Sequence, residues 1–317
     1  MSEKSSIFAL DLAYHSMTLS TTIEEQIAIL KERGIVITDE NKAKEVLADK
    51  GYFRLCTYFF PFRITYPHRT NNRGYREGTT FEDGLALYYF DVDLRRIMQY
   101  YLARIEVAVR SAIIYEVSNF YRSTPTWYID PTIVSQDTVD FIAQNVYTNK
   151  FIFDHPVIRR HNHKHPHTYA PAWKTLEYMT FGAVMNLFNS INSVDARRLV
   201  TKRFGIDPLS IFYNYFSNVS IARNICAHGS ALFDVRLCTA FADGPAGHLS
   251  NTGNKQNLQG IFTVVYYLLT KISTNRASDF KRDIQAIFED VKSKNPAIYA
   301  QLTQITGYNI TFFEEKC

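Results

Sequence analysis

Apolar residues recur along this chain mainly at intervals of three and four, the spacing that places them on one face of an α-helix. Two of the periodic stretches also begin with capping spacing, Thr22 with Glu25 and Thr80 with Asp83, in which side chains satisfy backbone amides at a helix start. The pattern predicts helices over residues 22–33, 39–50, 80–121, 173–191, 194–204, 208–228, 258–273 and 279–293.

Four segments interrupt this pattern. Residues 52–62 are rich in aromatic side chains and suit either a strand or a helix that buries an aromatic face. Residues 63–80 combine Pro, Gly and basic residues, which predicts a loop with room for a short β-hairpin. We expect the two remaining segments, 154–171 and the Gly- and Asn-rich 243–257, to be exposed loops.

These elements predict an all-α protein. The chain has 317 residues, of which 46% are hydrophobic and 21% charged, and this composition supports one large core or two moderate ones. It contains no repeat of solenoid length and no Ser- or Pro-rich linker. We therefore expect a helical bundle over 81–317, joined in one continuous globular unit to a helical and aromatic extension over 1–80.

Three features predict a cytoplasmic protein that does not enter a membrane. Residues 1–16 lack the apolar core of a secretory signal, and the most apolar stretch, 261–272, is too short to cross a bilayer of roughly 30 Å as a helix. The four cysteines lack CxxC spacing, which favours reduced thiols over a disulfide framework or a zinc ribbon. The formal net charge of +4 permits an anionic partner without requiring one.

Several motifs that identify common enzyme classes are missing from the sequence. It contains no GxxxxGK[ST], GxGxxG, HExxH or GxSxG pattern, so ATPase, dehydrogenase, zinc protease and α/β-hydrolase activities have no support. An aromatic RNA-binding sheet motif is missing as well. We expect no cofactor.

The segment 154–171 concentrates histidines and cations. Its histidines are His155, His161, His163, His165 and His167, and its cations are Arg159, Arg160 and Lys164. Neutral imidazoles bind zinc or nickel, which leaves a metal-binding sensor open, although alternating spacing in a loop defines no tetrahedral ligand set. The cations favour a solvated surface or a surface that contacts RNA phosphates.

Residues 223–228, RNICAH, carry the strongest candidate chemistry. Asn224 and His228 lie four residues apart and share a helix face, and the long Arg223 side chain can curl toward the same cleft. A guanidinium binds phosphate and stabilises transition-state charge, while an imidazole can remove the 2′-OH proton or protonate the leaving 5′-oxygen. This chemistry cleaves RNA without a metal. The spacing by itself is also compatible with a surface ion pair of Arg223 and a hydrogen-bonded His228 at a helix end.

The run RNICAHGSALFD closely resembles the signature of the HEPN superfamily, as found in bacterial Abi proteins of the AbiD/AbiF type, which act in abortive infection and phage resistance. Three further blocks resemble the same family in the same order: a Gly-Tyr-x-Arg-Leu block within 21–62, a Glu-x3-Arg helix within 95–118 and a Trp-x3-Glu-x3-Phe-Gly block within 170–188. The likeness spans most of the chain. Two positions depart from the family pattern, because Gly229 and Phe233 stand where a His and a Trp are common.

The resemblance implies an all-α core that forms a homodimer, with two R-x4-H motifs facing a shared cleft. Members are regarded as metal-independent endoribonucleases that leave 2′,3′-cyclic phosphates and act as antiphage proteins or toxins. By this likeness Arg223 would bind the scissile phosphate, His228 would act as general base or acid, and Asn224 would orient the pair. Glu106 and Arg110 would lie near the cleft or form a buried ion pair.

The block around residue 177 also makes a packing prediction. Trp173, Glu177 and Phe181 fall on one helical stripe, which we expect to face the core. Glu177 is the exception, because a buried carboxylate needs a partner. We therefore count Glu177 with Glu106 and Arg110 among the residues that bind RNA or support the site.

Two functions of different classes remain open. One is a homodimeric endoribonuclease, and the other is a non-catalytic RNA-binding or partner-binding module of the same superfamily. In either case RNA is the expected ligand, and a small RNA or a protein antitoxin is a candidate regulator.

Overall fold

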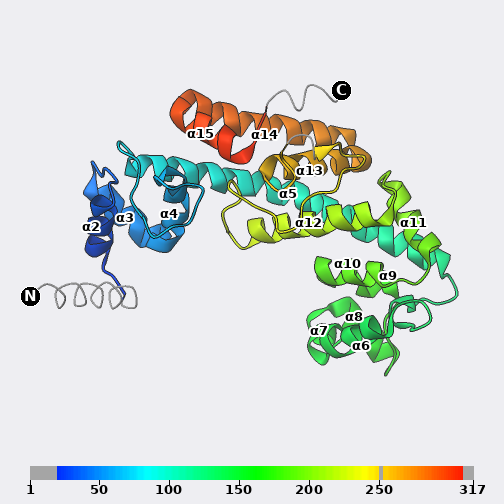
Figure 1. Cartoon of the computed structure of the whole chain (residues 1–317). Helices are drawn as coiled ribbons and strands as arrows, with labels where there is room; N and C mark the ends of the chain where they lie inside the picture. The colour runs from blue at the N-terminus through cyan, green and yellow to red at the C-terminus, as the bar shows by residue number, and fades with distance from the viewer. Residues whose placement is uncertain (1–19, 250–252, 310–317) are drawn as a thin grey trace, which may run out of the picture. The chain divides into compact units, whose positions relative to one another are not determined.

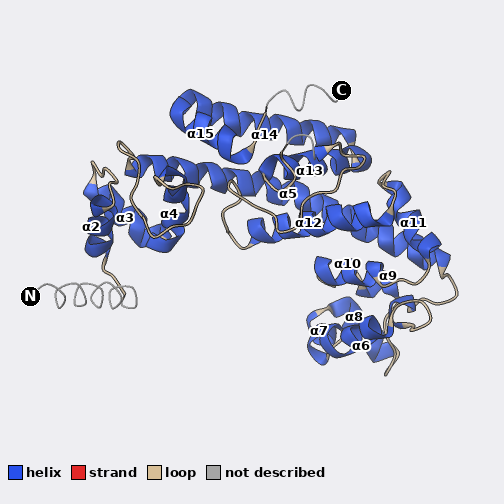
Figure 2. Ribbon diagram, viewed as in Figure 1, coloured by secondary structure: helices blue, strands red, loops and turns tan. Residues whose placement is uncertain are grey.

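The computed structural model describes residues 20–249 and 253–309, and within these ranges the chain forms helices and no β-strand (Figure 1, Figure 2). The all-α prediction is confirmed. The helices are α2 (Ile23–Glu32), α3 (Glu40–Lys50), α4 (Tyr52–Phe59), η1 (Phe60–Phe62), α5 (Phe81–Phe120), η2 (Trp127–Ile129), α6 (Gln136–Phe141), η3 (Ile142–Val146), α7 (Asn149–Asp154), α8 (Pro156–Lys164), α9 (Ala172–Thr175), α10 (Phe181–Asn189), α11 (Val194–Arg203), α12 (Leu209–Ala227), α13 (Leu258–Ile272), α14 (Thr274–Lys294) and α15 (Pro296–Thr306). Residues 1–16, where we expect no secretory signal, and Cys317 lie outside the described residues.

Contacts divide the chain into two compact units, one up to Phe90 and one from Asp91 onward, and the division falls inside α5. In the first unit, α2 begins with the predicted capping box. The Thr22 N–H donates to Glu25 Oε2 at 2.7 Å, and the Glu25 N–H donates to Thr22 Oγ1 at 3.2 Å. Local capping therefore sets where this helix begins.

The aromatic segment 52–62 is helical, which resolves the choice that its composition left open. The rings of Phe59 and Phe81 pack with their centroids 5.6 Å apart, so α4 buries an aromatic face against the start of α5. Beyond this segment, a single antiparallel bridge between Arg63 and Tyr75 stands in place of a β-hairpin.

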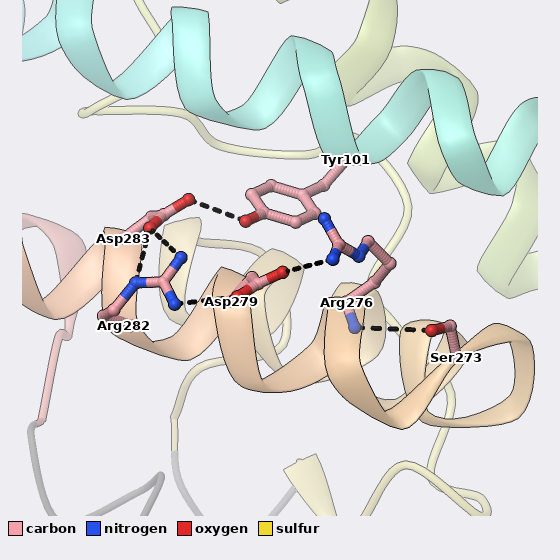
Figure 3. Close-up of polar contacts among 6 residues, drawn as sticks. All are labelled: Tyr101, Ser273, Arg276, Asp279, Arg282 and Asp283. Carbon is pink, nitrogen blue, oxygen red and sulfur yellow. Dashed lines mark hydrogen bonds and ion pairs between the residues drawn. The ribbon is translucent and has the colours of Figure 1, made fainter.

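The second unit is built on the remainder of α5, a helix of 40 residues in all. Figure 3 shows how α14 is tied to it: the Tyr101 hydroxyl donates to Asp283 at 2.7 Å. Arg282 pairs with Asp283 at 3.1 Å and with Asp279 at 2.8 Å, and Asp279 also pairs with Arg276 at 2.9 Å. Burial, reinforced by Asp283, raises the pKa of Tyr101, so its hydroxyl stays protonated and remains a donor.

The prediction of a loop over 154–171 is wrong for half of that segment, because α8 occupies nine of its 18 residues. Pro156 is the first residue of this helix, a position where its fixed φ and missing N–H favour a helix start. Ile158 is completely buried and anchors one face of α8. The cations Arg159, Arg160 and Lys164 therefore project from a helix and not from a loop.

The predicted continuous helix over 173–191 is also wrong, because the chain turns between α9 and α10. Thr180 caps α10 by accepting the N–H three residues further on at 3.3 Å, so a new helix begins at Phe181. The expected stripe is broken as a result. Phe181 is buried as predicted, but Trp173 is 48% exposed and Glu177 is exposed as well.

The segment before α13 is less exposed than predicted for 243–257. Ala246, Leu249 and Asn257 are all buried, and the Asn257 side chain accepts the Gly260 N–H at 3.2 Å to cap α13. The apolar run of α13 is buried in the second unit. Among the residues that the structure describes, no helix is both long and apolar enough to span a membrane.

Candidate functional site

The R-x4-H motif occupies the C-terminal end of α12. This helix buries one apolar face, formed by Phe212, Tyr215, Phe216, Val219, Ala222 and Cys226. Arg223, Asn224 and His228 lie beside that face: Arg223 is half-buried, and the other two side chains are exposed. The apolar spacing of α12 therefore turns the motif toward the surface.

The backbone directly after the motif forms a Schellman turn, in which the last carbonyls of a helix accept two N–H groups that follow it. His228 is the C-cap, the Gly229 N–H donates to the Cys226 carbonyl at 3.3 Å, and the Ser230 N–H donates to the Ile225 carbonyl at 3.1 Å. Gly229 has a φ of +69°, which a side chain would strain. The turn therefore favours glycine at position 229, where the family often has a His.

Glu106 links the motif arginine to a second arginine. Its carboxylate pairs with Arg223 Nε at 3.1 Å and with an Arg110 guanidinium nitrogen at 2.8 Å. The three side chains are only 23%, 21% and 11% exposed for Arg223, Glu106 and Arg110 respectively. The structure therefore brings together three of the residues that sequence analysis singled out, in a half-buried ion-pair network between α5 and α12.

Arg110 extends this network to the turn between α9 and α10. It donates to the backbone carbonyls of Leu176 and Glu177 at 3.3 and 2.5 Å. The Glu177 carboxylate itself has no hydrogen bond or ion pair among the described residues. Its expected role is corrected accordingly: Glu177 contributes its carbonyl oxygen to the network, and its exposed side chain does not need a buried partner.

A second acid–arginine pair on α5, Asp91 and Arg95, holds the segment that follows the motif. The buried Asp91 carboxylate accepts the N–H groups of Leu232 and Phe233 at 2.9 and 2.8 Å. Arg95 donates to the carbonyls of the first two residues after His228, at 3.3 and 3.1 Å. One carboxylate and one guanidinium thus satisfy four backbone groups of this loop.

Sequence analysis missed this pair, although a signal was present. Asp91 and Arg95 repeat the four-residue acid–arginine spacing of Glu106 and Arg110 on the same helix. Spacing can indicate a pair, but it cannot identify backbone partners that lie 141 and 142 residues away in the sequence.

The side chains of the motif are not joined to one another within one chain. Among the described residues, Arg223, Asn224 and His228 share no side-chain hydrogen bond, and the Arg223 guanidinium is directed to Glu106. The expected orienting role of Asn224 is therefore not visible in the isolated chain. The exposed imidazole of His228 is accessible to a ligand or to a second copy of the protein.

The described histidines form no metal site: no group of three or more His, Cys, Asp or Glu in these ranges could hold an ion. His155 stacks on Tyr178 with ring centroids 4.4 Å apart, and the rings of His161 and His165 lie 5.0 Å apart. Burial, followed by the charge of Lys174, lowers the pKa of His161, which favours its neutral form.

Comparison with protein-family models matches residues 45–234 to the family described as Abi-like protein. The matched range contains both acid–arginine pairs of α5 and the whole R-x4-H motif, and it covers more than half of the 317 residues. Comparisons with curated proteins and with solved structures found no match.

Proposed function

Since the chain belongs to the Abi-like protein family, we propose that it acts in the cytoplasm as a metal-independent endoribonuclease of the HEPN superfamily, of the AbiD/AbiF type. At the level of the family, this membership assigns the chain to abortive infection, a form of phage defence. The nuclease activity is the step that the motif geometry supports.

The observation that carries the proposal is the way Arg223 is held. Glu106 forms an ion pair with its Nε at 3.1 Å, without hydrogen-bond geometry, and no partner of its two terminal nitrogens is found among the described residues. Those nitrogens form the fork that binds a phosphate through two parallel hydrogen bonds. An arginine fixed on one side and available on the other suits recognition of the scissile phosphate.

His228 supplies the proton chemistry in this proposal. Its imidazole removes the proton from a ribose 2′-OH, the 2′-oxygen attacks phosphorus, and the bond to the 5′-oxygen breaks. The leaving 5′-oxygen takes up a proton from an imidazolium, which leaves a 2′,3′-cyclic phosphate and a 5′-OH. Arg223 stabilises the extra negative charge of the pentacovalent transition state.

We propose a homodimer because one chain brings one motif imidazole to a reaction that works best with both a base and an acid. An isologous interface, in which each chain contributes the same surface, would bring two copies of the motif to a shared cleft. The exposed His228 imidazole is accessible to such a partner.

End-labelled RNA in excess EDTA provides the direct test. We expect the wild-type chain to cleave it and both His228→Ala and Arg223→Ala to lose at least a hundredfold in rate, with 2′,3′-cyclic phosphate ends on the products. Matched controls are His248→Ala and Arg236→Ala, which remove an exposed His and an exposed Arg outside the motif. Equal cleavage by His228→Ala and wild type would exclude the proposed mechanism, and a fully active monomer in sedimentation would exclude the shared cleft.

A non-catalytic RNA-binding module is the second candidate, favoured by the absence of a side-chain hydrogen bond between Arg223 and His228 among the described residues. On this reading wild-type protein binds RNA without cutting it, and Arg223→Ala weakens binding. A small RNA or protein antitoxin would then be the partner, and sequencing of co-purified RNA with mass spectrometry of co-purified protein would identify it.

A further inference from the structure

Two stretches of the sequence contain several cations and no Asp or Glu. Residues 50–76 contain six Lys or Arg, and residues 155–176 contain four, namely Arg159, Arg160, Lys164 and Lys174. Helix α8 lies in the second stretch, which has a formal charge of +4. Such a local excess indicates an anionic partner.

Helix α8 displays three of these cations on its solvent side. Ile158 is fully buried and turns the opposite face of α8 inward. Arg159, Arg160 and Lys164 are exposed, and together with Pro156 and His163 they line an open hollow of about 340 Å³. The hollow thus presents several cationic groups to one ligand.

These cations are not neutralised by neighbouring carboxylates. Among the described residues, none of the three on α8 forms an ion pair; Arg159 instead donates to the Phe153 carbonyl at 3.3 Å. Asp154, the acidic residue just before α8, pairs with Lys150 at 3.0 Å. Mutual repulsion between cations on one helix is relieved when a polyanion binds.

Exposed aromatic rings lie on the two helices that contact α8. Phe153 of α7 is 68% exposed, and the Arg159 guanidinium lies 5.6 Å from its ring centroid. Trp173 of α9 is 48% exposed, and both α7 and α9 pack on α8. Aromatic rings beside a cationic groove bind unpaired bases by stacking, which a duplex prevents because its base faces are covered.

We propose that the α8 hollow, with the Phe153 ring beside it, is a binding surface for single-stranded RNA that is separate from the R-x4-H motif. The inference rests on the proposed function only in taking RNA as the polyanion. Arg159, Arg160 and Lys164 contact phosphates, and the Phe153 ring stacks on a base. The surface would hold a substrate strand or a regulatory RNA without taking part in bond cleavage.

The test is fluorescence anisotropy with a labelled oligouridylate, in a His228→Ala background that leaves the strand intact. The double variant R160E/K164E should bind at least tenfold more weakly than the His228→Ala parent. The slope of log affinity against log salt concentration should be shallower by about 1.4, because each lost phosphate contact removes about 0.7 from the slope. Phe153→Ala should weaken binding about tenfold with an unchanged salt dependence, because stacking is not ionic.

Control reversals are Arg96→Glu and Lys292→Glu, at side chains that are 75% and 53% exposed on α5 and α14. Each of these variants changes the net charge by as much as one reversal on α8. Each should nevertheless bind the oligouridylate within about twofold of the affinity of the His228→Ala parent. Circular dichroism of each variant checks that the fold is intact.

Three outcomes would overturn the inference. They are an unchanged affinity in R160E/K164E, equal affinity for a duplex of the same length, and binding of anionic phospholipid vesicles without binding of RNA. The cleavage assay tests the proposed nuclease activity separately. If wild-type protein cleaved no RNA, the nuclease proposal would fail, and the binding results for the α8 surface would be unaffected.

Discussion

Asp91 and Arg95, one turn apart on α5, both hold the segment that begins directly after His228. Asp91 accepts two backbone N–H groups and Arg95 donates to two backbone carbonyls of that segment. Further along the same helix, Glu106 holds Arg223. One helix therefore fixes both ends of the R-x4-H motif, although the motif side chains share no hydrogen bond among the described residues.

Removing the buried carboxylate at position 91 should destabilise the protein strongly. Asp91→Ala leaves the Arg95 guanidinium and two backbone N–H groups without their partner, and we expect a loss of about 3 kcal/mol in the free energy of unfolding. Urea denaturation followed by circular dichroism measures this loss.

The control for this experiment is Asp93→Ala on the same helix. Asp93 pairs with Arg96 at 3.3 Å, but its side chain is 54% exposed, so its removal should change the free energy of unfolding by less than about 0.5 kcal/mol. Equal effects of the two variants would contradict the assigned role of Asp91.

Glu106→Gln should reduce activity much more than stability. The substitution removes the charge that holds Arg223 but retains a side chain of similar shape, so we expect the free energy of unfolding to fall by about 1 kcal/mol. RNA cleavage should fall at least tenfold, because a displaced guanidinium no longer meets the phosphate.

Glu116→Gln is the matched control. Glu116 lies on α5, pairs with Arg203 at 3.5 Å and is 21% exposed, the same exposed fraction as Glu106. It should lose a similar amount of stability and keep its cleavage rate. If Glu106→Gln and Glu116→Gln lost cleavage activity equally, Glu106 would affect cleavage only through the stability of the fold.

Gly229→Ala should destabilise the turn after His228. The φ of +69° places a Cβ in the left-handed region, so we expect a loss of about 1 kcal/mol, and a smaller loss for Gly229→Asn, which tolerates that region better. Gly182→Ala provides the opposite control in α10. A Cβ there meets no atom within 4 Å and no positive φ is present, so the free energy of unfolding should rise by about 0.5 kcal/mol.

The cysteines should differ in their reaction with iodoacetamide. Burial, reinforced by the charge of Asp91, raises the pKa of Cys226 to about 12, so at pH 8 roughly one thiol in ten thousand is a thiolate. Cys238 is exposed and should react before Cys226 and Cys56. Peptide mass spectrometry of briefly labelled native protein locates the modified residues. Labelling of Cys226 at the rate of Cys238 would show that the end of α12 opens in solution.

Local signals predicted much of this structure correctly. The capping pair Thr80 and Asp83 marks the start of α5, where the Thr80 N–H donates to the Asp83 carboxylate at 2.8 Å. Helical apolar spacing then predicts α5 through to its end near residue 120, because such spacing reports burial of one face within a continuous segment. The resemblance to the family's Glu-x3-Arg block and R-x4-H motif singled out Glu106, Arg110 and Arg223, which meet in the structure.

The amino-acid sequence by itself determined the all-α class and the starts of the capped helices, since these depend on neighbours within a few positions. The candidate site residues came from the resemblance of the sequence to a family. Only the tertiary structure decided what Asp91 and Arg95 hold, how Arg110 reaches the carbonyl of Glu177, and that Trp173 and the cations of α8 face solvent. Each of those outcomes depends on chain segments far apart in sequence, and a periodic pattern carries no information about which distant backbone groups a side chain will meet.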